Sequence, residues 1–360
     1  MRKLYFLLVA LIVLFSAAVL YGQYAVYRYP GLTVDPVPLP TRLQLDSGIS
    51  LEFGGAYLQD ETALRFRAFL PDVTVTVRAE AESAPLTLQL ENIHPDATLR
   101  VNGGSIENIG ERVHGLLREL HIPALDSGKR LSLAWEFPQK SEYRFVAVGD
   151  TGGDRELDWA LLRAGELNAD FVLHLGDVYY YETELGGVGE RMNRGTVPVY
   201  TANGNHDFRG PEGNSFGLFM RNVGPLNARF ELLGSCFINL DTGAYMYPPH
   251  KGQRASLLAA ELLTQRNNPQ RCSEYIIFTH KPLVNAFEVE FPKQHHALHG
   301  YDARSLIRQL QQLGRVTIVA GHIHADFEFE QDGFKTYVAG GGLAHADLLQ
   351  GGFTARVLVG

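Results

Sequence analysis

Five short motifs rich in aspartate, asparagine and histidine hold the side chains of this sequence best suited to bind metal ions. Carboxylates, amides and imidazoles are metal donors, and a flanking glycine lets the backbone turn sharply. The motifs are Gly149-Asp150-Thr151-Gly152, Gly176-Asp177 with Tyr180, Gly204-Asn205-His206-Asp207, Thr279-His280, and Gly321-His322-Ile323-His324. A single Gly-Asp pair is more often a turn than a ligand. The ordered set of five, however, predicts a metal centre.

Each motif follows a short apolar run that predicts a buried β-strand. These runs are Phe145–Val148, Phe171–Leu175, Val197–Ala202, Tyr275–Thr279 and Val316–Ala320. Helical patterns lie between them, which predicts an α/β domain over residues 141–360. Because ligands of such folds gather at the carboxyl ends of the strands, we expect the five motifs on one rim.

The motifs resemble those of the calcineurin-like metallophosphoesterases, and among them the purple acid phosphatases. The resemblance covers roughly residues 143–342 and implies an αββα fold, in which a β-sheet sandwich is flanked by helices. Most of that superfamily has a histidine two residues after the first aspartate, where this sequence has Gly152. Purple acid phosphatases lack that histidine and have a tyrosine three residues after the second aspartate, which is Tyr180 here. These two positions favour the acid-phosphatase subgroup.

The resemblance implies a site for two metal ions. One ion would bind Asp150, Asp177, Tyr180 and His324, and the other would share Asp177 and bind Asn205, His280 and His322. Three anionic oxygen donors in the first set suit Fe³⁺, whereas the more neutral second set suits Zn²⁺, Fe²⁺ or Mn²⁺. A metal-bound hydroxide would then attack phosphorus in line.

Other residues of this region are expected to act without binding metal. By resemblance, His206 hydrogen-bonds the phosphate or protonates the leaving oxygen, with Asp207 as the residue that orients it. His295 and His296 lie in a loop that often contacts substrate in this family, although an exposed polar loop is the alternative. His174 alternates within a predicted strand, and we interpret it as a core residue.

The function expected from these features is phosphomonoester hydrolysis, with a phosphorylated small molecule or another phosphoester as substrate. A phosphodiesterase or pyrophosphatase with the same metals is the alternative, and a non-catalytic, membrane-tethered binding protein is a remote one. Two Asp-Thr-Gly triplets, at Asp150 and Asp241, are also typical of aspartic proteases. The α/β pattern between them and the histidine motifs disfavour that reading.

The first third of the chain has a different pattern. Residues 43–140 alternate apolar and polar side chains in several short runs, for example Val73-Thr74-Val75-Thr76-Val77, which predicts an antiparallel β-sandwich. Residues 23–42 form a proline-rich linker. No group of catalytic residue types occurs in the sandwich, so we expect it to pack or position rather than react.

The pattern of residues 1–22 predicts a signal anchor or a signal peptide. Arg2 and Lys3 precede the apolar stretch Leu4–Tyr21, which is long enough to span a bilayer. We expect an uncleaved anchor with the protein on the extracytoplasmic side, and secretion after signal cleavage is the alternative. Export permits a disulfide between Cys236 and Cys272, if their strands are neighbours; two free buried thiols are the other reading. The net charge of −8 disfavours a nucleic-acid-binding protein.

Overall fold

The computed structural model describes residues 2–28, 40–103, 109–153, 155–180, 182–207, 215–243, 248–283, 300–340 and 356–359. In these residues the helices are α1 (Arg2–Arg28), α2 (Arg155–Glu166), α3 (Glu182–Met192), α4 (Ser215–Asn222), α5 (Pro248–Asn267) and α6 (Gly300–Leu310). Within the same ranges, no helix combines the length and the apolar character that a membrane crossing needs.

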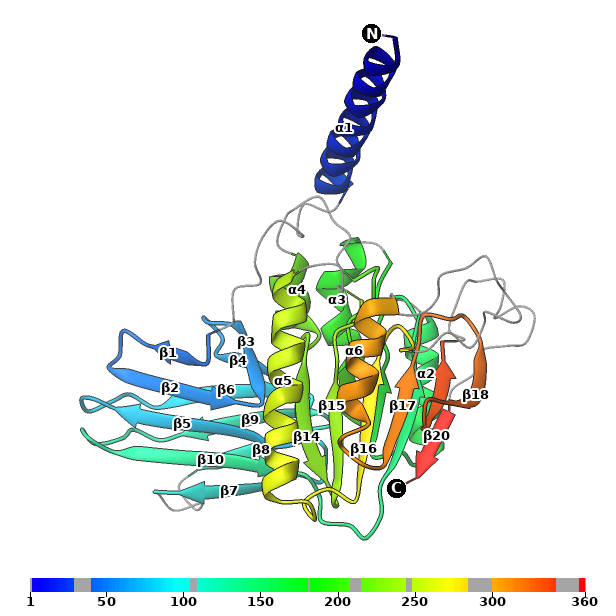
Figure 1. Cartoon of the computed structure of the whole chain (residues 1–360). Coiled ribbons are helices and arrows are strands. Elements are labelled where there is room, and N and C mark those ends of the chain that lie inside the picture. The colour runs from blue at the N-terminus through cyan, green and yellow to red at the C-terminus, as the bar shows by residue number, and fades with distance from the viewer. Residues whose placement is uncertain are drawn as a thin grey trace.

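The described residues between 42 and 136 form two five-stranded sheets that pack face to face (Figure 1). The first contains, in spatial order, β1 (Arg42–Gln44), β2 (Ile49–Gly54), β5 (Val73–Ala79), β10 (Arg130–Glu136) and β7 (Thr98–Asn102). The second contains β3 (Ala56–Asp60), β4 (Arg65–Ala68), β6 (Leu86–Glu91), β9 (Leu117–Ile122) and β8 (Gly110–His114). The alternation along β5 buries Val73, Val75 and Val77 completely in the shared core.

One strand pair departs from the antiparallel pattern that the sequence predicts. β4 and β6 run parallel, with Phe66 opposite Leu90. The intervening β5 belongs to the other sheet, so the chain crosses the core twice and β6 returns in the direction of β4. All other strand pairs of these two sheets, in the described residues, are antiparallel.

The remainder of the chain builds two further sheets. The four-stranded sheet contains β13 (Val199–Thr201), β12 (Phe171–His174), β11 (Arg144–Val148) and β20 (Arg356–Val359). The six-stranded sheet contains β14 (Ala228–Leu232), β15 (Ser235–Asn239), β16 (Glu274–Thr279), β17 (Val316–Ala320), β19 (Phe334–Ala339) and β18 (Asp326–Gln331). Within each sheet, the strands that precede the five motifs are parallel to one another, whereas β20 is antiparallel to β11.

Three apolar layers hold these two sheets and their helices together. Aromatic side chains such as Phe145, Phe171 and Phe237 fill the layer between the sheets. The outer face of the four-stranded sheet packs on α2, α3 and α4. The outer face of the six-stranded sheet packs on α5 and α6, which lie in front of it in Figure 1. The layers therefore have the order helix, sheet, sheet, helix.

Buried polar contacts join the β-sandwich to the α/β layers. The side chain of Asn92 accepts a hydrogen bond from the N–H of Val199 (2.8 Å) and donates to the carbonyls of Val199 and Ala68 (2.9 Å each). It thus pairs with the edge strand β13 as a further strand would. Arg67, also buried, donates to the Oδ1 atom of Asn193 just after α3 (2.8 Å).

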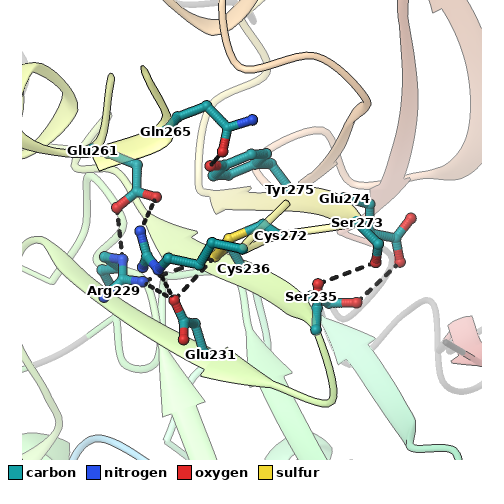
Figure 2. The surroundings of a disulfide bond; sticks show 12 residues. Arg229, Glu231, Ser235, Cys236, Glu261, Gln265, Cys272, Ser273, Glu274 and Tyr275 are labelled. Atoms are coloured by element: carbon teal, nitrogen blue, oxygen red, sulfur yellow. Dashed lines mark hydrogen bonds and ion pairs between the residues drawn. A yellow bond between two sulfur atoms is a disulfide. The ribbon is translucent and has the colours of Figure 1, made fainter. Parts of the chain in front are cut away.

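A disulfide joins Cys236 of β15 to Cys272, which lies just before β16 (Figure 2). The two strands are parallel neighbours, and the Cα atoms of the cysteines lie 5.7 Å apart. Arg229 lies beside this disulfide, and its guanidinium forms ion pairs with the carboxylates of Glu231 and Glu261 (Figure 2). The bond therefore fixes the ends of two central strands at the edge opposite the motifs.

Candidate metal centre

The five motifs meet on one rim of the two sheets, because each comes directly after the carboxyl end of a parallel strand. Asp150, Asp177 and Asn205 come after β11, β12 and β13, the three adjacent parallel strands of the smaller sheet. His280, and then His322 with His324, come after β16 and β17 of the larger sheet. The two sheets face each other, so the two sets of side chains converge.

Asp150, Asp177 and His280 form the buried floor of this rim. One donor atom from each lies within 4.8 Å of the others, and all three side chains are almost completely shielded from solvent. Two buried carboxylates so close together repel each other unless cations or protons compensate for them. The arrangement is therefore typical of a metal site.

The orientation of His280 is set by a backbone carbonyl. Its Nδ1 atom lies 2.8 Å from the carbonyl oxygen of Leu175, which can only accept, so Nδ1 carries the proton. The Nε2 lone pair is then free to bind a metal ion, as in many protein sites where the second ring nitrogen is held in this way. Burial, with the nearby His322, lowers the pKa of His280 well below its ordinary value and keeps the ring neutral.

The Nε2 atom of His280 faces further metal-donor atoms. It lies 3.1 Å from Oδ1 of Asn205, 3.6 Å from Oδ1 of Asp177 and 3.1 Å from Nδ1 of His322. The amide oxygen of Asn205 and the carboxylate oxygen of Asp177 cannot donate a proton to Nε2 of His280. Converging lone pairs of this kind repel unless a cation lies among them, so the residues present fit a metal ion on this side.

Asp150 lies on the other side of the floor. Its Oδ2 atom accepts the backbone N–H of His322 at 2.7 Å, and Nε2 of His324 lies 3.5 Å from Oδ1. That Oδ1 atom is buried and has no hydrogen-bond partner among the described residues. Burial raises the pKa of Asp150, and His324 opposes this rise. A buried carboxylate oxygen without a donor also fits a bound cation.

Tyr180 covers the Asp150 side of the site. Its hydroxyl donates to the carbonyl oxygen of Asp150 at 3.3 Å, and its ring lies edge-on to His206 with centroids 4.8 Å apart. The backbone N–H of His206 donates to Oδ1 of Asp177 at 2.8 Å, and its Nε2 atom lies 3.9 Å from Oδ2 of the same residue. Tyr180 and His206 are both partly exposed to solvent.

The backbone is strained at three of the positions that carry donors. Asp150, Asp177 and His322 have φ values of 60°, 52° and 66°, in the left-handed region that non-glycine residues seldom adopt. Each such residue costs about 1–3 kcal/mol and persists where the surroundings impose it, commonly at functional sites. The strain directs these side chains inward from three separate strand ends.

Close backbone packing beneath the donors requires glycine at two positions. A Cβ atom on Gly204 would lie 2.0 Å from Oδ1 of Asp177, and one on Gly176 would lie 2.8 Å from Nδ1 of His280. No side chain fits in either place. The glycines of the motifs therefore let the Asp177, Asn205 and His280 loops touch.

Asp207 does not orient His206 as the sequence interpretation has it. Its two oxygens instead accept four backbone N–H groups, from residues 177–179 and from Gly204. Burial nevertheless raises the pKa of Asp207 to about 7, because desolvation outweighs these hydrogen bonds. The carboxylate thus ties the Asp177 loop to the Asn205 loop and acts on the backbone rather than on the imidazole.

The second Asp-Thr-Gly triplet has a structural place that sequence reasoning missed. Oδ1 of Asp241 accepts a hydrogen bond from Nδ2 of Asn203 (2.7 Å), and Asp150 is engaged with His322 and His324. The chain between Asp150 and Asp241 forms strands and the helices α2 to α4, unlike the all-β aspartic proteases. The structure thus agrees with the sequence analysis in excluding an aspartic protease. The triplet follows the apolar strand β15 (Ser235–Asn239), and this strand was the only feature of the sequence to indicate that the triplet also reaches the rim.

Of the other histidines considered in the sequence, the structure describes His174 but not His295 or His296. The interpretation of His174 as a core residue is confirmed, since the ring is fully buried and burial lowers its pKa to about 3. Its Nε2 atom lies 2.8 Å from Oγ1 of Thr151, next to Asp150. His295 and His296, the predicted substrate contacts, lie outside the described residues.

Comparisons with known proteins give one family match. The sequence profile of the calcineurin-like phosphoesterases matches residues 143–326, which is about half of the chain and contains all of the proposed ligands. Among proteins with curated descriptions, none matches the sequence.

Several solved structures are similar. A purple acid phosphatase from yellow lupin (Lupinus luteus) is 17% identical, with a TM-score of 0.47, over 76% of this chain and 62% of the lupin chain. This chain thus spans less than two thirds of that protein. A dimetal phosphatase from Danio rerio is 15% identical, with a TM-score of 0.40, over 55% of this chain and 87% of its own. The anchor in the inner membrane complex of Plasmodium is 16% identical, with a TM-score of 0.40, over 56% and 73% of the two chains.

Proposed function

Because this chain belongs to the calcineurin-like phosphoesterase family, we propose that its rim of seven donors binds two metal ions and hydrolyses phosphomonoesters. The observation that carries the proposal is the convergence of Asp150, Asp177 and His280 in one buried cluster. Asn205 and His322 extend this cluster on one side and Tyr180 and His324 on the other. A binding protein that had lost catalysis would have no need to retain all seven.

The donor chemistry divides the site into two halves. Asp150, Tyr180 and His324 would hold a trivalent ion such as Fe³⁺, and Asn205, His280 and His322 a divalent ion, with Asp177 shared between them. Bound there, the two ions would clamp the phosphate and activate a water molecule for in-line attack. The chain's own contribution is to hold these donors at fixed positions before substrate arrives.

His206 is the proposed proton donor to the leaving oxygen. Its backbone is held by Asp177, while its ring lies against Tyr180 and is partly exposed. A ring in this place can reach a phosphoester on the rim. His206→Ala is expected to lower kcat by about 10²–10⁴-fold, the range for loss of a general acid. The metal content should stay unchanged.

The acid-phosphatase subgroup is supported by Tyr180 and Gly152. The experiment is elemental analysis of the purified protein together with its visible spectrum and its turnover of chromogenic mono- and diesters. We expect iron, a tyrosinate–Fe³⁺ absorption band that Tyr180→Phe abolishes, and faster turnover of monoesters. A colourless, fully active protein with two zinc or two manganese ions would contradict the subgroup, and faster diester turnover would favour a phosphodiesterase.

The proposal of phosphoester hydrolysis itself is tested at Asp177. Because both proposed metal ions would bind this carboxylate, Asp177→Ala should remove detectable turnover, as should a chelator. Turnover that survives either treatment would overturn the metal assignment.

We further propose that the protein works outside the cytoplasm. The apolar segment Leu4–Tyr21 after Arg2 and Lys3, and the disulfide between Cys236 and Cys272, support export, since disulfides persist in oxidising compartments. Fractionation of cells that express the full chain would test this. A reduced protein in the cytosolic fraction would contradict it.

A further inference from the structure

The loop Asp241–Gly243 reaches the rim but contributes no proposed ligand. It comes after β15, which is parallel to β16, so it leaves the larger sheet at the same edge as His280. Asp241 and Thr242 are both completely buried. Buried polar side chains need hydrogen-bond partners. Since these two take no part in the proposed chemistry, their partners indicate their role.

The hydroxyl of Thr242 contacts the residues on both sides of His280: the backbone of Lys281 and the side chain of Thr279. It accepts the N–H of Lys281 at 2.7 Å and lies 2.7 Å from the hydroxyl of Thr279. Thr279 in turn donates to the carbonyl of Leu240 at 2.8 Å, so the proton between the two hydroxyls comes from Thr242. A single directed chain of hydrogen bonds thus fixes the residue before His280 and the residue after it.

The carboxylate of Asp241 holds the segment that carries Asn205. Its Oδ1 atom accepts the side-chain N–H of Asn203, a fully buried residue two positions before Asn205. Asp241 is itself fixed by its own backbone, whose N–H donates to Asn227 (2.9 Å) and whose carbonyl accepts from Arg254. A Cβ atom on Gly243 would lie 2.6 Å from the carbonyl oxygen of Asn203, so the two loops are in direct contact.

Asn205 and His280 are neighbours in the site, and both belong to the half assigned to the divalent ion. We propose that Asp241 and Thr242 are positioning residues for this half: Thr242 sets the backbone of His280, and Asp241 sets the approach of Asn205. The inference rests on the proposed two-metal site. It assigns the second Asp-Thr-Gly triplet a role in selective retention of the divalent ion. The donors of the other half, Asp150, Tyr180 and His324, contact one another and the backbone of His322.

The test replaces the hydroxyl of Thr242 by a methyl group of similar size. Thr242→Val should bind the divalent ion at least tenfold more weakly in direct titration of the demetallated full chain, while the affinity for the first ion and the tyrosinate band stay as in wild type. Thr242→Ser keeps the hydroxyl and should restore binding. Thr336→Val is the matched control, because Thr336 is a fully buried threonine of β19 whose hydroxyl has no hydrogen-bond partner among the described residues.

Asp241→Ala provides a second, independent variant, with the same selective loss expected, should Thr242→Val fail to fold. Divalent affinity equal to wild type in a folded Thr242→Val or Asp241→Ala protein would overturn the inference, as would equal weakening of both ions. The two proposals fail separately. A wild-type chain that binds both ions without hydrolysing phosphoesters would overturn the proposed function and leave this inference intact.

Discussion

A Cβ atom on Gly152 would lie 3.1 Å from Cδ2 of Tyr180 and 3.4 Å from its Cε2 atom. The missing side chain at one position therefore makes room for the tyrosine ring at the other. Gly152 also has a φ of +61°, which a residue with a side chain adopts only at a cost. Gly152 and Tyr180, the two residues that favour the acid-phosphatase subgroup, are thus linked by packing: the tyrosine ring occupies the space beside the glycine.

Gly152→Ala should displace Tyr180. We expect the tyrosinate–Fe³⁺ band to shift or weaken and kcat to fall by about tenfold or more, since small misplacements at a reacting centre are costly. The visible spectrum and steady-state kinetics measure both. Gly187→Ala in α3 is the control, because its added Cβ would meet nothing within 4 Å. A normal spectrum in Gly152→Ala would show that the contact does not position the tyrosine.

Metal binding should stabilise the folded protein through the buried cluster of Asp150, Asp177 and His280. Free metal at a hundredfold its dissociation constant stabilises by about 2.7 kcal/mol. The melting temperature should therefore rise when metal is returned to the demetallated protein. The rise should be lost in Asp177→Ala and kept in Asp126→Ala, an exposed aspartate of the β-sandwich. An equal rise in both variants would place the stabilising metal elsewhere.

Asn92 should contribute strongly to the junction between the β-sandwich and the α/β layers. Asn92→Ala leaves the buried N–H and C=O of Val199 without their partner, which should lower the free energy of unfolding by about 2–4 kcal/mol. Urea denaturation measures the loss. Because Asn92 has a φ of 63°, Asn92→Gly removes the same hydrogen bonds without backbone strain. Wild-type stability in Asn92→Gly would mean that the hydrogen bonds contribute little.

His94 should make stability depend on pH in the acidic range. Burial and nearby Lys140 and Arg118 lower its pKa from 6.5 to about 4, although Asp96 and Asp170 oppose this. Between these two values the unfolded chain binds a proton that the folded chain does not, so stability should fall as the pH drops from 6.5 to 4. Above pH 6.5 this contribution is constant.

Replacing His94 by asparagine tests that dependence. His94→Asn removes the titrating ring but keeps a side-chain acceptor for the N–H of Asp96, which Nδ1 accepts in the wild type at 3.0 Å. The unfolding midpoint, measured from pH 4 to 7, should vary less with pH in the variant. An unchanged pH dependence would assign the effect to other groups.

The disulfide should add substantially to stability under oxidising conditions. It links residues separated by 36 positions, and closing a loop of that size in the unfolded chain stabilises the fold by about 4 kcal/mol. Reductant should therefore lower the melting temperature of the wild type, whereas the double variant Cys236→Ala, Cys272→Ala should melt lower and be insensitive to reductant. A wild type insensitive to complete reduction would contradict this.

Several parts of the site were predictable from local sequence pattern. The apolar runs before Asp150, Asp177 and His280 are strands in the structure, because continuous apolar residues of that length need burial on both faces. Parallel strands bring the residues after their carboxyl ends to one edge of the sheet, so the order of the motifs implied a common rim. The alternating residues around Val75 likewise specified a sheet with one buried face.

Other features were decided only by the tertiary structure. That Thr242 brackets His280, that Asp207 binds backbone rather than His206, and that Asn92 pairs with β13 depend on which strands lie side by side. The parallel pairing of β4 with β6 is of the same kind. Local periodicity reports which face of a strand is buried but not which strand is its neighbour, because that choice depends on the packing of segments far apart in the chain. The sequence alone therefore determined the candidate donors and their common rim, and the fold determined what holds them in place.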